Sequence, residues 1–220
     1  MTPSRDVAAA LPGLEAMPVI GILRRCPPRL AVSAAAEAVE AGITVLEVTL
    51  DSDDFLGQLH DIRSQFPTAT VGLGSVTNRD DAITAVAAGA AFVVAPTVNA
   101  DVIHVCMEAS ILVVPGAATP TEIAHALGMG APVVKIFPAD LLGGPAYLRA
   151  ILSPLGRPPL IPTGGITPQT ASAYLNAGAL AVGAGSSLFP PVALAAGDTA
   201  VVRRAAEAFV SAVSSALPPT

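Results

Sequence analysis

The chain has 220 residues, enough for one domain with a full hydrophobic core. Apolar residues make up 52% of it and charged residues 13%, which excludes an intrinsically disordered protein. The net charge is −6 and the arginines are scattered. This argues against a protein that binds nucleic acid, because such proteins carry a basic surface.

The same composition indicates a compartment and a redox state. No apolar stretch reaches the ~20 residues of a membrane helix, and Met1–Ala10 lacks the apolar segment of a secretory signal. We therefore expect a cytoplasmic protein without membrane contacts. Cys26 and Cys106 are the only cysteines, and we expect both to be reduced thiols. Neither they nor the scattered histidines have the spacing of metal ligands, so we expect no metal.

The predicted strands recur at fairly even spacing, which is typical of a repeated structural unit. Asp6–Met17 precedes them and is expected to form an extra helix. The apolar runs, rich in β-branched residues, are Val19–Leu23, Thr44–Leu50, Ala69–Leu73, Phe92–Ala95, Ile111–Val114, Val133–Phe137, Leu160–Pro162 and Ala181–Gly183.

Alanine-rich helical patterns lie between these runs. They cover Leu30–Ala41, Asp80–Ala88, Thr121–Leu127, Pro145–Leu152 and Pro168–Ala177, with Thr199–Leu217 as a closing helix. His60 and His104 fall in further outer helices, where surface or packing roles are expected.

Helix ends are marked in the sequence as well. Gly42, Gly89 and Gly178 follow helical patterns and suit a left-handed C-terminal cap. Thr119-Pro120 and Thr167-Pro168 suit helix starts, with the hydroxyl as the N-cap.

Strand runs that are apolar on both faces indicate a buried parallel sheet. Eight strands alternating with helices predict an α/β protein, a (β/α)₈ TIM barrel that forms one domain over residues 1–220. The N-terminal helix would cap its bottom. An open, doubly wound sheet is the alternative, weakened because no G-x-G-x-x-G follows the first strand.

Lys135 is the candidate nucleophile. It is the only lysine in the chain and interrupts the apolar strand Val133–Phe137. Burial of an ammonium group is costly, and desolvation favours the neutral amine. A neutral amine in an apolar pocket is the nucleophile of Schiff-base chemistry. The alternative is an ammonium group that reaches the surface or pairs with a carboxylate.

Glu47 interrupts the strand Thr44–Leu50 in the same way. Side chains alternate along a strand, so Glu47 shares a face with Val45 and Thr49, as Lys135 does with Val133 and Phe137. If both faces point into the barrel, a carboxylate and an amine converge there. A purely structural buried ion pair is the alternative, although such pairs contribute little net stability.

Two glycine-rich loops follow the seventh and eighth strands, at Pro162–Thr167 and Gly183–Ser187. Loops at these places in a barrel often bind phosphate through backbone N–H groups. Tight turns without a ligand are the alternative.

Three more polar residues end strands. Thr163 and Ser75 are expected either to donate hydrogen bonds to a substrate or to act only as turn hydroxyls. Arg24 is expected to pair with a carboxylate or phosphate. One of Arg24 and Arg25 is expected to be merely solvated.

These segments resemble a known family, the 2-keto-3-deoxy-6-phosphogluconate, 2-keto-3-deoxy-6-phosphogalactonate and 4-hydroxy-2-oxoglutarate aldolases. The resemblance runs from about Met17 to Pro190. It is carried by Pro18–Arg24, Leu46–Leu50, Val71–Ser75, Pro115-Gly116, Val134–Ala139 and Pro162–Ile166.

The resemblance implies roles for the candidate residues. The Schiff-base lysine falls on Lys135, the acid/base glutamate on Glu47 and the threonine before the paired glycines on Thr163. The phosphate loops fall on Gly164, Gly165, Gly185 and Ser186. Members of the family are typically homotrimers without metal or organic cofactor.

The sequence departs from the family pattern at two positions. Asp51 stands where the phosphogluconate enzymes usually carry arginine, and a carboxylate there would repel an anionic substrate. In phosphogalactonate-type members that position resembles asparagine, and the strand-1 arginine, here Arg24, is kept. Ser75 replaces a usual threonine.

These features predict a class I aldolase, a carbon–carbon lyase of carbohydrate metabolism. It would cleave a 2-keto-3-deoxy-6-phospho sugar acid to pyruvate and glyceraldehyde 3-phosphate, with Phe137 against the methyl end of pyruvate. A phosphogalactonate or hydroxyoxoglutarate substrate is an alternative. So is a phosphate-binding barrel isomerase, which the lone strand lysine disfavours, and a non-catalytic sugar-phosphate binder, which Asp51 keeps open.

Overall fold

The computed structural model describes residues 5–215, in which helices and parallel strands alternate. The strands are β1 (Val19–Leu23), β2 (Val45–Thr49), β3 (Thr70–Gly74), β4 (Phe92–Val94), β5 (Leu112–Val114), β6 (Gly116–Ala117), β7 (Val134–Ile136), β8 (Leu160–Pro162) and β9 (Val182–Ala184). The helices are α1 (Arg5–Ala10), α2 (Gly13–Ala16), α3 (Pro28–Ala41), α4 (Phe55–Gln65), α5 (Arg79–Ala87), α6 (Ala100–Glu108), α7 (Pro120–Gly128), α8 (Gly144–Leu152), α9 (Pro168–Asn176), α10 (Pro191–Ala195) and α11 (Ala200–Ser214).

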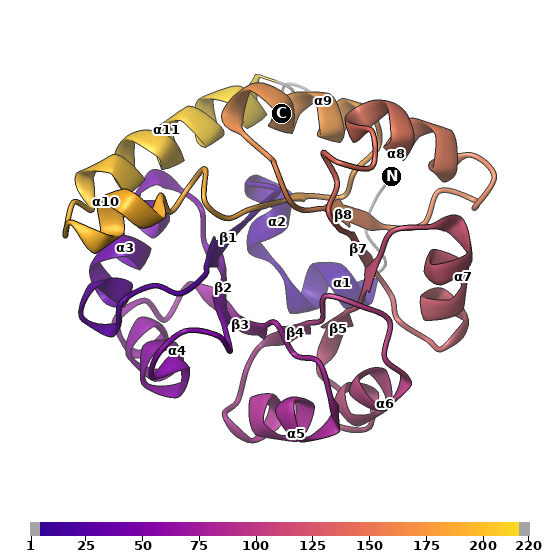
Figure 1. Ribbon diagram of the computed structural model, residues 1–220, viewed down its shortest axis with the longest axis horizontal. Coiled ribbons are helices and arrows are strands. Elements are labelled where there is room, and N and C mark those ends of the chain that lie inside the picture. Colours follow the sequence, from indigo (N-terminus) through magenta and orange to yellow (C-terminus); the bar gives the residue numbers. More distant parts are fainter. Residues whose placement is uncertain (1–4, 216–220) are drawn as a thin grey trace.

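Every strand pair is parallel. One sheet has the order β5-β4-β3-β2-β1-β9 and the other β6-β7-β8. Pro115 alone separates β5 from β6, and Thr163 at the end of β8 forms a parallel bridge with Gly183 of β9. The strands therefore follow a strongly curled path with the longer helices on its outer side (Figure 1).

Alternation along the strands divides the core into an outer and an inner part. In β2, Leu46 and Val48 pack outwards against the helices, whereas Val45 packs inwards. In β7, Val134 and Ile136 pack outwards. The face that carries Glu47 and the face that carries Lys135 therefore both point inwards, as the sequence predicts.

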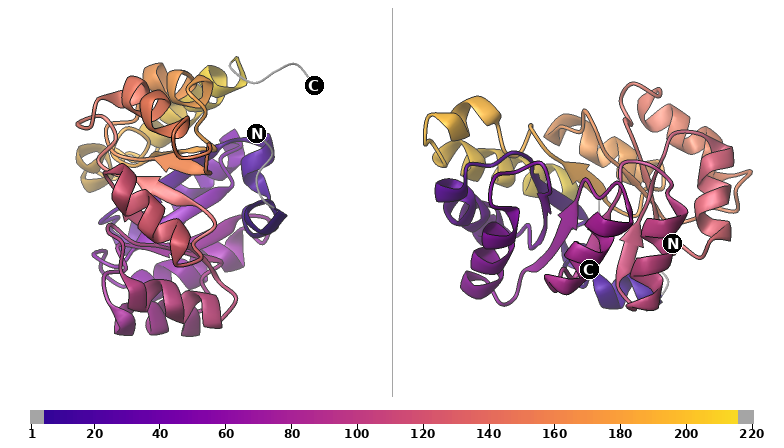
Figure 2. Two further views of the ribbon diagram at one scale, coloured as in Figure 1. Left: turned by 90° about the vertical axis from the view of Figure 1, so that its right-hand side faces the viewer. Right: turned by 60° about the horizontal axis from the view of Figure 1, so that its bottom comes forward.

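The N-terminal helices lie against the inner part of the core. Val7, Leu11 and Leu14 are buried there with inward side chains of the strands. Gly13 lies against Thr44, the residue before β2, so these helices occupy the side on which the strands begin (Figure 2).

The single helix expected over Asp6–Met17 is two short helices instead. The helix α1 ends at Ala10, and α2 begins at Gly13. Pro12 separates them, because its ring removes a backbone N–H and disfavours helical backbone at the preceding residue. At the other end of the chain, the described part of the closing helix is Ala200–Ser214, and the last residues of the expected range lie outside the described residues.

The other predicted elements agree with the observed ones to within one or two residues. The strands expected at Val19–Leu23 and Leu160–Pro162 have those bounds. Gly42, Gly89 and Gly178 have positive φ values of 111°, 73° and 106°, as expected for residues that end helices.

Two further expectations concern caps and cysteines. Thr119 is the N-cap of α7, where its hydroxyl accepts from the Glu122 N–H and the Glu122 carboxylate accepts from the Thr119 N–H. Cys26 and Cys106 are free thiols, and burial raises the pKa of each to about 11. Within residues 5–215, no helix is both long and apolar enough to cross a membrane.

Candidate active site

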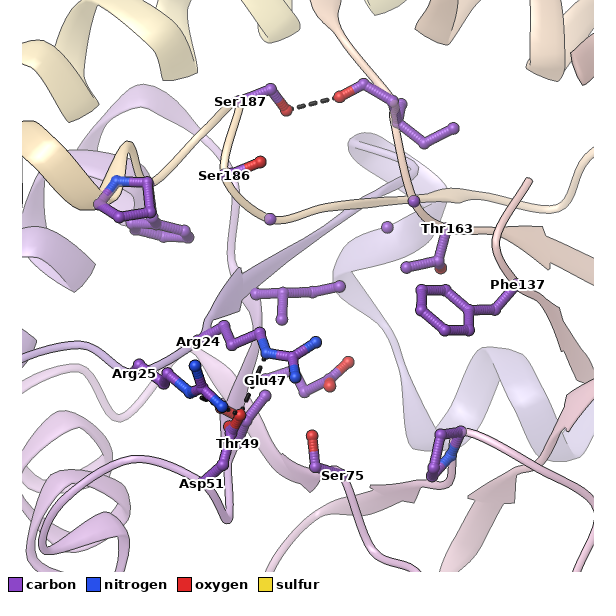
Figure 3. A pocket seen from close by; sticks show the side chains of 18 of the residues that line it. Arg24, Arg25, Glu47, Thr49, Asp51, Ser75, Phe137, Thr163, Ser186 and Ser187 are labelled. Carbon is purple, nitrogen blue, oxygen red and sulfur yellow. Dashed lines mark hydrogen bonds and ion pairs between the residues drawn. The ribbon is translucent and has the colours of Figure 1, made fainter. Parts of the chain in front are cut away.

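A cavity of about 1010 Å³ opens where the strands end. All ten residues selected from the sequence line it, although they come from six different strands or the loops after them. Figure 3 shows several of them, among them Glu47, Phe137 and Thr163. These residues are Arg24, Glu47, Ser75, Lys135, Phe137, Thr163, Gly164, Gly165, Gly185 and Ser186.

Lys135 lies in β7 and lines this cavity. Its backbone is fixed between two strands, paired with Gly116 of β6 and Ile161 of β8. The side chain is 9% exposed, and its Nζ lies 5.0 Å from the centre of the Phe137 ring. Phe137 and Ile22 also line the cavity, so the surroundings of this side chain are in part aromatic and apolar. The amine therefore faces the cavity.

Glu47 is the buried acid of the site, only 3% exposed. Burial raises the pKa of its carboxyl, whereas the charges of Lys135 and Arg24 lower it and that of Asp51 raises it. The net direction is upwards. A carboxyl group in this state exchanges protons more readily near neutral pH than an ordinary glutamate, which suits an acid/base catalyst.

Two strand glycines make room for the polar side chains. A Cβ atom on Gly74 would lie 1.8 Å from the Oε1 atom of Glu47, and one on Gly183 would lie 2.3 Å from the Oγ1 atom of Thr163. Neither position tolerates a side chain without moving its polar neighbour. The third and last strands are therefore shaped around Glu47 and Thr163.

The two glycine loops lie beside each other at the cavity, as expected from their places in the chain. Gly164 and Gly165 follow β8 with positive φ values of 96° and 69°. The hydroxyl of Ser187, in the loop after β9, donates to the carbonyl of Ile166 in the loop after β8 at 2.5 Å. This bond ties the two loops together, with Ser186 next to it (Figure 3).

Arg24, Arg25 and Asp51 form an ion cluster at another wall of the cavity (Figure 3). The Nε atoms of both arginines donate to the same carboxylate oxygen of Asp51, each at 3.1 Å. Although partial burial raises the pKa of Asp51, its interactions with Thr49, Arg24 and Arg25 hold that pKa below its usual range.

The expectation that one of the two arginines is merely solvated is therefore wrong. Successive side chains of an extended strand point to opposite faces. Arg25, however, lies after β1 with a left-handed backbone, φ 50°. That turn brings it to the same side as Arg24. The carboxylate of Asp51, expected to repel an anion, is paired with two guanidinium groups.

Ser75 also has a left-handed backbone, with φ 61°. A residue other than glycine is rarely found in this region, and such strain concentrates at functional sites. Its hydroxyl points towards the centre of the cavity, on the side of Glu47 (Figure 3).

The sequence did not single out the wall formed by Phe189, Pro191 and Leu194. These residues lie in and just before α10, a five-residue helix after the last strand. Its only signal in the sequence is the pair Pro190-Pro191, because proline suits the first turn of a helix. Among residues 5–215, no group of His, Cys, Asp or Glu side chains is arranged to hold a metal ion.

This arrangement can capture an electrophile. An amine beside a buried carboxyl group can attack a ketone and exchange the protons that imine formation and C–C cleavage require. Glycine loops with free N–H groups can hold an anionic group of the same molecule.

Comparisons with known proteins agree with that chemistry. The profile of the aldolase family described as KDPG and KHG aldolase matches residues 9–205. A 2-dehydro-3-deoxy-phosphogluconate aldolase of Treponema pallidum is 35% identical over 189 residues, covering 86% of this chain and 89% of its own. A KHG/KDPG aldolase of Escherichia coli K12 is 34% identical over 181 residues, covering 80% and 85%.

A solved structure is similar over almost the whole chain. It is a KDPG aldolase from Legionella pneumophila with pyruvate captured at low pH as a covalent carbinolamine intermediate. The two are 29% identical, with a TM-score of 0.84 over 94% of this chain and 98% of that one. The fold, the site and these relatives define an aldolase, a carbon–carbon lyase of class I. The chain belongs to the KDPG and KHG aldolase family.

Proposed function

We propose that the enzyme cleaves a 2-keto-3-deoxy-6-phospho sugar acid to pyruvate and glyceraldehyde 3-phosphate, with Lys135 as the Schiff-base residue. The observation that carries this proposal is the pair of buried groups, Lys135 and Glu47, at one cavity. Relatives named for phosphogluconate substrates support the choice of substrate.

The reaction begins when the neutral amine of Lys135 attacks the C2 ketone, and loss of water gives a protonated imine. The imine draws electrons towards C2. Glu47, directly or through a water molecule, removes the proton of the C4 hydroxyl, and the C3–C4 bond breaks. The aldehyde leaves, and its bonding electrons remain as an enamine on Lys135.

Proton return completes the cycle. Glu47 gives its proton back to C3 of the enamine, which restores an imine of pyruvate, and water then hydrolyses that imine to pyruvate and the free amine. Phe137 packs against the methyl end of pyruvate, while Ser75 and Thr163 donate hydrogen bonds to the substrate. The N–H groups of the two glycine loops, at Gly164, Gly165, Gly185 and Ser186, hold the phosphate.

The test is covalent trapping. Borohydride with pyruvate should add the mass of a reduced pyruvyl group to the peptide that contains Lys135. Because this is the only lysine in the chain, the adduct maps to a single side chain. An Arg149→Lys variant, with a second lysine on α8, checks that trapping is selective for position 135. Absence of the adduct, or an active Lys135→Ala protein, contradicts the mechanism.

The choice between substrates needs a separate assay. Turnover of the gluconate, galactonate and 4-hydroxy-2-oxoglutarate substrates, measured side by side as pyruvate release, ranks them. We expect the phosphorylated sugar acids to have the lower KM, because only they have a phosphate group for the glycine loops. A lower KM for hydroxyoxoglutarate would contradict that assignment.

We also propose that the two sheets close into one (β/α)₈ barrel, a single domain capped at its bottom by α1 and α2. The bridge between Thr163 and Gly183 and the one-residue gap at Pro115 support this closure. Amide hydrogen exchange tests it. If the barrel is closed, the amides of β8 and β9 at their junction should exchange at one slow rate. If the junction is open, these amides should exchange faster than those of the other strands.

The family resemblance further supports a homotrimer. Sedimentation or light scattering of the purified protein should give three times the chain mass of 21.9 kDa. A monomer or dimer at micromolar concentration would contradict it.

A further inference from the structure

The ion cluster of Arg24, Asp51 and Arg25 has two guanidinium groups for a single carboxylate, whereas an ordinary ion pair has one. One carboxylate oxygen of Asp51 receives the Nε–H groups of both arginines. Two guanidinium groups against one carboxylate leave a net charge of +1. All three residues line the cavity that contains Lys135.

The atoms that Asp51 contacts determine what the arginines still offer. Both bonds use Nε, at the inner edge of each guanidinium group. Within residues 5–215, the terminal nitrogens of Arg24 donate no hydrogen bond to another side chain or backbone group. They point towards the middle of the cavity, beside Glu47 (Figure 3). Arg24 and Glu47 line the same cavity as Lys135.

The loops after β1 and β2, which carry the cluster, are both bonded to the buried side chain of Gln58 in α4. Gln58, 2% exposed, donates from Nε2 to the carbonyl of Cys26 at 2.9 Å and to that of Asp53 at 2.7 Å. These carbonyls belong to the loops after β1 and β2. Thr49 adds a contact to Ser52 at 3.3 Å. The positions of Arg24 and Asp51 relative to each other are thus held by buried groups.

We propose that Asp51 is a specificity-determining positioning residue, which holds Arg24 with its terminal nitrogens free to receive the carboxylate of the 2-keto acid. This inference rests on the proposed function. A planar guanidinium group binds a carboxylate best when its orientation is fixed in advance. The net charge of +1 matches a carboxylate, whereas two uncompensated arginines would attract the dianionic phosphate end of the substrate to the wrong wall.

The first experiment compares Asp51→Asn with Asp53→Asn. Asp53 lies two residues along the same loop, is exposed and does not line the cavity. Its variant makes the same change in net charge as Asp51→Asn, but away from the site. We expect Asp51→Asn to raise the KM for the phosphorylated keto acid about tenfold, the typical effect of losing one charge-assisted hydrogen bond, with a smaller change in kcat. Asp53→Asn should leave both constants unchanged.

The second experiment is a double-mutant cycle with Arg24→Ala. If Asp51 acts through Arg24, Asp51→Asn should have little further effect on KM once Arg24 is absent. A full effect of Asp51→Asn in the Arg24→Ala background would overturn the proposal, as would equal KM values for Asp51→Asn and wild type.

A pH profile adds a readout that loss of structure would not produce. Lys135, Arg24 and Asp51 are the charged groups that act on Glu47, and Asp51 raises its pKa. Asp51→Asn should therefore move the acid limb of kcat/KM to lower pH, and Asp53→Asn should not. If the acid limb of kcat/KM stays at the same pH in Asp51→Asn, the cluster does not influence Glu47 and this part of the proposal is wrong.

Failure of this inference can be distinguished from failure of the proposed function. The pyruvyl adduct at Lys135 is measured first on the wild-type enzyme, and its absence contradicts the Schiff-base mechanism itself. If wild type forms the adduct and the Asp51 variants behave like Asp53→Asn, the mechanism stands and the role of Asp51 is wrong.

Discussion

At the scale of the residue, Glu47 shows how the fold changes the chemistry of one side chain. In an unfolded chain it is an ordinary carboxylate. In the folded protein burial raises its pKa, and Lys135 and Arg24 offset only part of that effect. Its ionisation is therefore costly in the folded state, and that cost affects both catalysis and stability.

The catalytic consequence is tested by Glu47→Gln. The amide keeps the shape of the side chain but accepts no proton, so kcat should fall by about 10²–10⁴-fold. In wild type the base must be ionised, so kcat/KM should fall as the pH drops through a value above the usual range of glutamate. The pH–rate profiles of both proteins check this. An acid limb that survives in the glutamine variant would assign the base elsewhere.

The consequence for stability has the opposite sign from that of a paired surface acid. Because the folded pKa of Glu47 is above its unfolded value, the folded state binds the extra proton between the two values. Stability should therefore decrease as the pH rises through the folded pKa. Melting temperatures across pH should show this decrease in wild type and in the exposed control Glu207→Gln. Glu47→Gln should lack it, and an unchanged decrease there would contradict the assignment.

Gly74 tests whether the position of Glu47 matters. In Gly74→Ala the new Cβ would lie 1.8 Å from the Glu47 carboxylate, which must move. We expect a loss of kcat with folding intact, and a destabilisation of about 1–3 kcal/mol from overpacking. Gly128→Ala is the matched control, since its Cβ meets nothing within 4 Å at the end of α7. Equal kcat values for both variants would show that Glu47 tolerates the shift.

At the scale of the element, the two glycine loops act as one unit because Ser187 bonds to Ile166. Each loop alone is a tight turn. Fixed together after β8 and β9, they bring their N–H groups to one wall of the cavity. The arrangement of these N–H groups therefore depends on a contact between the loops after two successive strands.

Ser187→Ala removes that contact. We expect KM for the phosphorylated substrate to rise about fivefold, the effect of one ordinary hydrogen bond, while trapping of pyruvate at Lys135 is unchanged because pyruvate has no phosphate. Ser172→Ala is the control, because its hydroxyl makes a bond of the same length, 2.5 Å, to Ala212 away from the cavity. If both variants raise KM equally, the weaker substrate binding comes from a general destabilisation of the fold and not from the contact between the two loops.

At the scale of the whole molecule, helices from distant parts of the chain pack against each other. The last helix, α11, lies against α3 near the start of the chain. Arg203 there forms ion pairs with Glu37 and Glu40 of α3. These pairs connect α11 to the last turns of α3.

Arg203→Met tests the contribution of that contact. We expect a small decrease in melting temperature that shrinks at high salt, because partly exposed ion pairs are screened. Arg204→Met, one residue further along and exposed, should change neither. A decrease that does not depend on salt would assign the loss to packing of the side chain instead.

The sequence alone determined the alternation of strands and helices, because burial on both faces of a parallel sheet produces continuous apolar runs. It also determined the polar residues that interrupt those runs, since a charge in a buried strand is costly without a function. Lys135 and Glu47 were found in this way. The break at Pro12 was missed because a helical pattern on both sides outweighed one proline, although proline is a strong local signal.

Only the tertiary structure decided how these residues combine. The left-handed backbone of Arg25 could not be predicted, because the sequence carries no glycine or asparagine there to indicate it. As a result, Asp51 is paired with both arginines, and the three side chains together carry a net charge of +1 in place of an isolated carboxylate. The cost of ionising Glu47 depends in the same way on burial and on charges contributed by other strands. Local patterns select the residues, and long-range packing sets their energies.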